Sequence, residues 1–224
     1  MPRLFLAALL LVAGSMRAQS GDAAAGLAGH LEDKTYVSAS GAFRVAIPVL
    51  PELGGRISDT PNTVTFQDDY NFVFTIAALP LDATQRWELS TRGMKDYLAY
   101  FFANFVMPDF QDTFRGAHVE SAKFAPAVHG GSLIVYTLLP GGSMFAHKLP
   151  FVDPGAPAPE AKRGNALLVR NGWIYILSTE LAERVLERST YRKTTDEENE
   201  ILRQRLVAML DKMEFPAPPA EDAK

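Results

Sequence analysis

Histidines are the residues whose type and spacing come nearest to catalytic chemistry in this sequence. The four are His30, His118, His129 and His147. No two of them have the i,i+4 spacing of helical metal ligands, and no H-E-x-x-H frame is present. The run from His129 to Ser132 resembles the oxyanion loop of lipases, but the G-x-S-x-G nucleophile elbow is missing, and a tight turn explains its glycines equally well. A hydrolase built from distant acids and His129 or His147 stays an alternative hypothesis.

Oxygen-bearing side chains are concentrated between two apolar runs, from Asp68 to Asn71. Asp68, Asp69 and Asn71 could bind a hard cation such as Ca²⁺, although the EF-hand frame with its closing Glu is absent. A solvated loop between strands is the simpler interpretation. No cofactor is expected, and the absence of cysteine excludes thiol catalysis, thiolate metal sites and disulfides.

The segment over residues 139–163 is long and rich in Pro and Gly, and it carries apolar side chains among polar ones. Long irregular segments often have functional roles, and an apolar tip indicates contact with a partner or the edge of a pocket. The candidate binding residues are Met144, Phe145, His147 and Phe151. The alternative is that Phe145 and Phe151 fold back onto the core.

The first 20 residues have the pattern of a secretory signal peptide. Arg3 precedes an unbroken apolar run over 4–12, which is too short to span a bilayer, and small or polar residues follow. We therefore expect an exported, periplasmic or secreted protein with no transmembrane anchor in its mature chain. The net charge of -4 argues against nucleic acid as a partner, since that requires clustered Lys and Arg.

Strand patterns dominate the residues that follow. Alternation of apolar and polar residues predicts strands over 43–47, 56–59 and 63–67, the last two joined by a turn at Thr60-Pro61-Asn62. The uniformly apolar run over 72–79 predicts a central strand that is covered on both faces.

A long amphipathic helix is predicted over residues 82–105 and is expected to end before Pro108. Its apolar residues recur at intervals of three and four and form an aromatic stripe: Trp87, Met94, Tyr97, Leu98, Phe101, Phe102 and Phe105. Such a stripe either packs on a sheet or lines a ligand groove. The first interpretation is favoured because a sheet needs this cover.

The second half repeats the order of strands and then helix. Strands are predicted over 117–124, 132–139, 166–170 and 173–178, with a hairpin turn at Asn171-Gly172. A short helix is expected within 179–189. The final helix begins with a capping box of Thr195 and Glu198, and its apolar face comprises Leu202, Leu206, Met209, Leu210 and Met213.

These elements predict an α+β fold. We expect an αβα sandwich, in which a central, mainly antiparallel sheet is covered by the long aromatic-rich helix and the C-terminal helix. The predicted organisation is a signal peptide over 1–20, a flexible lead over 21–34, a single domain over 35–215 and a Pro-rich disordered tail over 216–224.

The opening strand reads Y-x-S-x-x-G-x-F-x-V-x-x-P, from Tyr36 to Pro48. With the order of elements over residues 35–215, it resembles the Mog1/PsbP-like fold group, and more narrowly the exported bacterial proteins of that group. The resemblance implies a small αβα sandwich that acts by binding a partner protein or assembly rather than by catalysis. None of the group's partner-binding or metal-binding residues matches a position here.

The leading hypothesis is therefore an exported, non-enzymatic module that binds a protein or an envelope component. The hydrolase is one alternative, and a small-ligand carrier that uses the aromatic stripe of the long helix is another.

Overall fold

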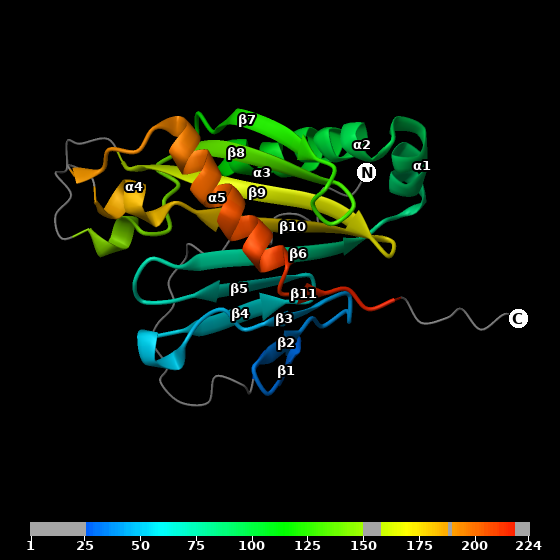
Figure 1. Ribbon diagram of the computed structural model, residues 1–224, viewed down its shortest axis with the longest axis horizontal. Helices are drawn as coiled ribbons and strands as arrows, with labels where there is room; N and C mark the ends of the chain where they lie inside the picture. Colours follow the sequence, from blue (N-terminus) through cyan, green and yellow to red (C-terminus); the bar gives the residue numbers. More distant parts are fainter. Residues whose placement is uncertain (1–25, 150–157, 188–189, 218–224) are drawn as a thin grey trace, which may run out of the picture.

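A computed structural model describes residues 26–149, 158–187 and 190–217. Its main sheet has seven antiparallel strands in the order β4-β5-β6-β10-β9-β8-β7 (Figure 1). The strands are β4 (Arg56–Thr60), β5 (Thr63–Gln67), β6 (Val73–Pro80), β7 (His118–Ala125), β8 (Ser132–Pro140), β9 (Glu160–Arg170) and β10 (Trp173–Glu180). The predicted signal peptide over 1–20 lies outside the described residues. So do the candidate binding residue Phe151 and the tail beyond residue 217.

Two hairpins of this sheet were predicted with their turns. β4 pairs with β5 from Arg56↔Gln67 to Thr60↔Thr63, and β9 pairs with β10 across Asn171-Gly172. Asn171 and Gly172 have φ of 52° and 79°, the positive values that a type I′ turn requires. The long segment after β8 is shorter than expected, because β9 already begins at Glu160.

The opening strand belongs to a second sheet, which the sequence pattern did not separate from the first. This sheet has the order β1-β2-β3-β11. Its strands are β1 (His30–Glu32), β2 (Thr35–Val37), β3 (Arg44–Ala46) and β11 (Met213–Glu214). The pairing of Val45 with Met213 joins the two ends of the fold.

Residues 21–34 were expected to be flexible, but in the structure the second half of this segment is bound to the fold. β1 pairs with β2, and the Asp59 carboxylate accepts hydrogen bonds from the backbone N–H groups of Ala28 and Gly29, at 2.9 and 2.8 Å. Tyr36 donates to the same carboxylate at 2.7 Å. A half-buried strand side chain thus orders residues that carry no ordering pattern of their own.

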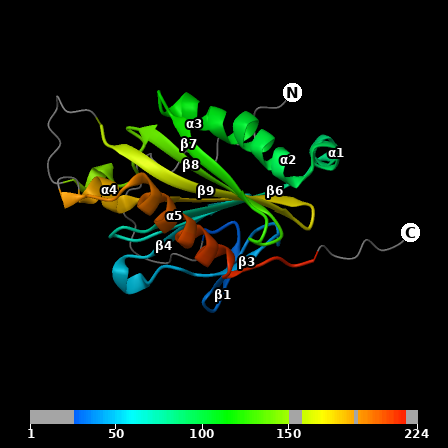
Figure 2. The same cartoon turned by 45° about the horizontal axis from the view of Figure 1, so that its top comes forward.

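One face of the main sheet is covered by a chain of short helices (Figure 2). They are α1 (Ala83–Arg92), α2 (Met94–Phe101), the π-helix η4 (Phe102–Val106) and α3 (Met107–Thr113). The prediction of one continuous helix ending before Pro108 was wrong at both points. Gly93 separates α1 from α2, and the helical run continues from η4 through Pro108 in the first turn of α3.

Most of the aromatic stripe faces the sheet. Tyr97, Leu98, Phe101 and Phe102 are buried in the same apolar cluster as Leu133, Val135, Leu167 and Ile176 of the sheet. Trp87 and Phe105 are exceptions, with 61% and 38% of their surfaces exposed, and Trp87 lies on α1, a helix in which no residue is buried. The stripe therefore packs mainly in the core. It does not line the groove that the small-ligand carrier hypothesis requires.

The opposite face is covered by α5 (Thr195–Leu210), with α4 (Ala182–Leu186) beside it (Figures 1 and 2). The capping box lies one residue earlier than expected, at Thr194 and Glu197. Glu198 is instead buried and accepts a hydrogen bond from the fully buried Lys162 of β9 at 3.0 Å. The predicted apolar face is buried, and the α+β class and αβα layering are confirmed.

Two tyrosines under α5 set an alkaline limit of stability. Burial raises the pKa of Tyr136 and of Tyr175 to about 12, above the ordinary value of 10.0. In the unfolded chain these tyrosines ionise near the ordinary pKa of 10.0. Their contribution to the free energy of unfolding is therefore fully present below pH 10 and is lost as the pH rises toward 12. We expect phenolate absorbance and loss of circular dichroism to change together in that window. Full phenolate formation near pH 10 with an intact fold would contradict this.

Within the described residues, no helix has both the length and the apolar character needed to cross a membrane.

Candidate functional site

Three loops meet at one end of the main sheet, at the side of α4 (Figure 1). They are the loop over 50–55 between β3 and β4, the loop over 68–72 between β5 and β6, and the loop over 141–149 after β8. We call them the end loops. Together they hold both sets of candidate residues that the sequence indicated separately, apart from Phe151.

The first end loop has a fixed shape. Pro51 begins the 3-10 turn η3 (Pro51–Leu53), which Gly54 closes with φ 71° and a hydrogen bond from its N–H to the Pro51 carbonyl. Gly54 has a positive φ that favours glycine, and a Cβ atom there would collide with the Asp69 carboxylate and displace that side chain. Leu50 and Leu53 are left 57% and 40% exposed.

The second end loop is folded around Asp68. One of its carboxylate oxygens accepts hydrogen bonds from the backbone N–H groups of Tyr70 and Phe72, at 2.9 and 3.0 Å. The Asp69 N–H donates to the Leu53 carbonyl at 3.0 Å, which joins the first two loops. Tyr70 stands at the tip with 60% of its surface exposed.

These contacts engage the carboxylates that were proposed as metal ligands. Asp68 binds backbone of its own loop, and Asp69 forms an ion pair with Arg56 at 2.9 Å. Asn71 is exposed. In the part of the chain that the structure describes, no three metal-ligating side chains come together.

The third end loop folds back onto the core. Phe145 is 1% exposed and lies in a small apolar cluster with Val73, Ala182 and Val185. Its proposed role as a surface contact was therefore wrong, and the alternative interpretation holds for this residue. Met144 packs against the same cluster, whereas His147 is exposed on the 3-10 turn η5 (Ala146–Lys148).

Glu180 fixes the beginning of this loop. Its buried carboxylate accepts hydrogen bonds from the Ser143 hydroxyl at 2.5 Å and from the Met144 N–H at 2.9 Å. Arg163 of β9 lies 3.7 Å away and donates to the Gly142 carbonyl at 2.8 Å. Burial raises the pKa of Glu180 and lowers the pKa of Arg163, while their mutual attraction opposes both shifts. The pair is a structural anchor, and Ser143 donates to a carboxylate that Arg163 neutralises.

Lys148 joins the second and third end loops. Its ammonium donates to the carbonyl oxygens of Tyr70 at 2.9 Å and Asp68 at 3.3 Å. The partners are about eighty positions apart in sequence, and neither the Pro-Gly-Gly pattern nor the Asp run indicates the contact. Sequence reasoning missed Leu50, Leu53, Tyr70 and Lys148 as site residues, because their exposure or pairing depends on loops that meet only in the fold.

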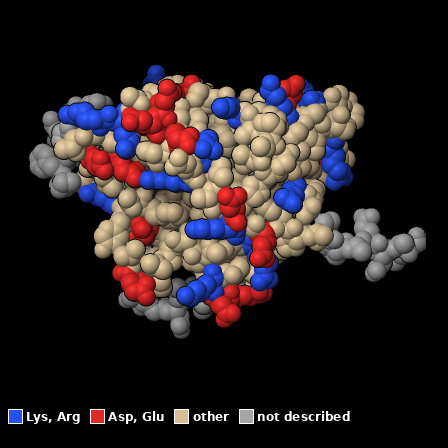
Figure 3. All heavy atoms as spheres, in the orientation of Figure 1, with Lys and Arg blue, Asp and Glu red and all other residues tan. Residues whose placement is uncertain are grey.

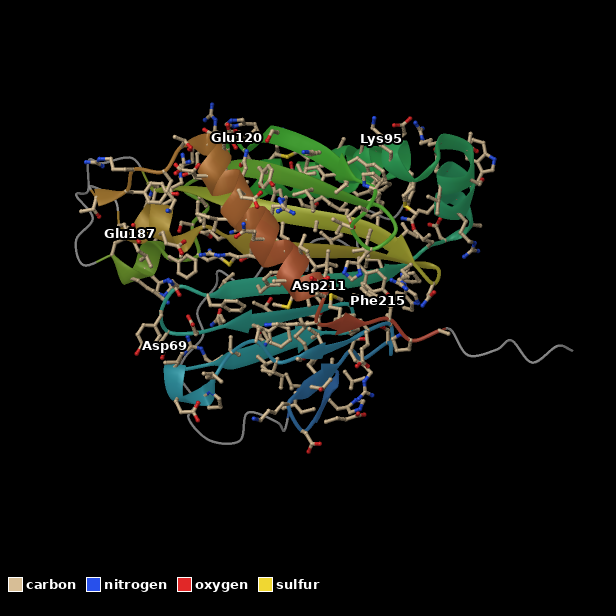
Figure 4. The ribbon with its side chains drawn as sticks, in the orientation of Figure 1. Asp69, Lys95, Glu120, Glu187, Asp211 and Phe215 are labelled. Carbon is tan, nitrogen blue, oxygen red and sulfur yellow. The ribbon has the colours of Figure 1, made fainter. Side chains whose placement is uncertain are left out.

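The candidate catalytic histidines lie apart. His129 precedes β8 and His147 follows it, so they lie beyond opposite ends of a nine-residue strand that is about 30 Å long. His129 contacts the Asp211 carboxylate at 3.0 Å, and Asp211 lies apart from Asp69, at the other end of α5 from the end loops (Figure 4). The nearby Ser132 hydroxyl donates to the Val128 carbonyl rather than to this histidine. The described residues therefore form no site that combines these histidines with a nucleophile.

Charged side chains of both signs are interspersed over the face shown in Figure 3. That face has no extended region of one sign. It offers neither the basic stripe that nucleic acid requires nor a single-sign field that would steer a charged ligand.

No model of a protein family matches the chain, and no curated protein matches it significantly in sequence. Among solved structures it is similar to the Ran-binding protein Mog1p of Saccharomyces cerevisiae, with 11% identity and a TM-score of 0.47 over 82% of this chain and 95% of Mog1p. It is also similar to cyanobacterial PsbP (CyanoP) of Synechocystis, with 11% identity and a TM-score of 0.49 over 91% of this chain and 100% of CyanoP. Mog1p and PsbP are also the proteins after which the fold group resembled by the opening strand is called, and at TM-scores below 0.5 the likeness says nothing of function.

Proposed function

We propose that this protein is an exported, non-enzymatic binding module that docks a protein of the cell envelope through its end loops. The observation that carries the proposal is the exposure of Leu50, Leu53 and Tyr70 on loops that are hydrogen-bonded to one another. We call these three side chains the docking surface. Export rests on the signal peptide predicted from the sequence.

The chemistry of the docking surface fits a protein partner. Tyr is enriched among the residues that dominate binding energy, and two Leu side chains beside it add apolar area that water covers poorly. Arg56 and Asp69 lie next to it as a paired, partly exposed rim. Exposed apolar side chains accompanied by a polar pair are typical of protein interfaces.

The loops are also ordered before any partner arrives. Asp68, Gly54 and Lys148 fix the backbone on which Tyr70 and Leu53 stand. A partner would bind without the entropic cost of ordering these loops, which favours affinity for a given area.

Photo-crosslinking in the native envelope tests this function. A photoreactive amino acid is placed at Tyr70 in the full chain, and a matched variant carries it at Trp87. Trp87 is equally exposed, at 61%, but lies beyond the opposite end of β6. We expect one dominant protein adduct from position 70 and none of that mass from position 87.

Tyr70→Ala should weaken capture of that partner by about 30-fold, the loss of about 2 kcal/mol that defines a binding hot spot. Its stability should stay within about 0.5 kcal/mol, since the side chain is exposed. Equal adducts from both positions, or none from position 70, would contradict the proposed function.

A further inference from the structure

The loop over 68–72 was proposed from its sequence as a cation site, and in the fold it does bind a cation, which is the ammonium of Lys148. We propose that Lys148 is a built-in cation that holds the docking surface in its binding conformation. The proposal rests on the function proposed above, since it assigns a positioning residue to that surface.

The contact has the chemistry of a cation site. Two backbone carbonyl oxygens, of Asp68 and Tyr70, converge on one ammonium at 3.3 and 2.9 Å. Carbonyl oxygens are ligands that hard cations use in loops of this kind. Burial lowers the pKa of the Lys148 ammonium, and the carboxylates of Asp68 and Asp69 oppose that shift by attracting the charge. The Phe145 ring centroid lies 5.1 Å from the ammonium.

The arm that carries the ammonium is rigid. Phe145 is buried, Ser143 and Met144 are bound to Glu180, and the backbone N–H of Lys148 donates to the Phe145 carbonyl at 3.0 Å. The ammonium is therefore delivered at a set position relative to the main sheet. It connects the buried anchor at Glu180 to the tip that displays Tyr70.

The effect on Tyr70 follows from the direction of its peptide groups. Asp68 draws the N–H groups of Tyr70 and Phe72 toward its carboxylate, while Lys148 holds the carbonyls of Asp68 and Tyr70. Without the ammonium, two carbonyl dipoles converge with no donor between them. The peptide groups would then rotate toward water, and Tyr70 would lose its fixed direction.

Charge and packing are separated by two substitutions at this position. Lys148→Met keeps the apolar stem and removes the charge, whereas Lys148→Arg keeps the charge. Lys95→Met, at an exposed lysine of α2, is the matched control (Figure 4). Hydrogen exchange of the purified mature protein reports the amides of Asp69, Tyr70 and Phe72 directly.

In Lys148→Met we expect these amides to exchange about tenfold faster, which corresponds to the loss of one charge-assisted hydrogen bond. The melting temperature should stay within about 4 °C. Lys148→Arg should retain most of the protection, and Lys95→Met should match the unmodified protein. Unchanged exchange in Lys148→Met would overturn the proposal.

The second readout is crosslinking from position 70 in the Lys148→Met background, where we expect at least a fivefold loss of the adduct. An adduct of unchanged yield would overturn the positioning role while leaving the docking function intact. If the unmodified protein gives no adduct while its exchange responds to Lys148→Met, the proposed function fails and the internal cation stands, because exchange needs no partner.

Discussion

Phe145→Ala should lower the free energy of unfolding by about 3–5 kcal/mol, the cost of emptying a buried aromatic site. Phe145 is 1% exposed and fills the space between Val73, Ala182 and Val185. Denaturant titration followed by circular dichroism measures the change, with Tyr70→Ala as the control at the same end of the molecule. The two substitutions should therefore separate stability from binding.

The opposite pattern is the outcome that would refute the assignment. If Phe145→Ala left stability intact and abolished partner capture, Phe145 would be a surface contact, which was one of the two interpretations of its sequence. Deleting residues 144–151 should likewise unfold the protein, because the deletion removes both Phe145 and the Met144 N–H that binds Glu180.

Glu180→Leu should also lower the free energy of unfolding by about 3–5 kcal/mol, because it leaves the buried Arg163 guanidinium without its counter-charge. It also releases the Ser143 hydroxyl and the Met144 N–H. Glu187→Leu, at an exposed glutamate near the same end (Figure 4), should change stability by less than about 0.5 kcal/mol.

A double-mutant cycle identifies the cause. Replacing Arg163 and Glu180 together by leucine should recover a large part of the loss, since a buried ion pair exchanged for apolar side chains is often neutral in stability. Additive losses in the double variant would show that the hydrogen bonds of the loop, rather than the unpaired charge, set the cost.

Much of the fold followed from local pattern. The uniformly apolar run of β6, the hairpins at Pro61-Asn62 and Asn171-Gly172 and the apolar face of α5 were each recognised from their period or their turn residues. These features are set within a few residues, so the sequence alone contains their physical cause.

Errors arose where tertiary contacts overrule local preference. Pro108 was expected to end a helix, but the helical backbone runs on through it, directly after the π-helix η4. Residues 28–32 have little pattern, and the Asp59 carboxylate and pairing with β2 order them. Glu198 looked like a cap, but the buried ammonium of Lys162 draws it inward.

By itself the sequence determined the α+β class, the antiparallel hairpins, the covering helices and the absence of thiol chemistry, because each depends on composition or on spacing along the chain. Only the tertiary structure decided which candidate residues face water. It buried Phe145, exposed Tyr70 with Leu50 and Leu53, and brought Lys148 to carbonyls some eighty positions away. The reason is physical: exposure and ion pairing depend on which loops meet, and loops from distant strands meet only when the sheet that carries them is complete.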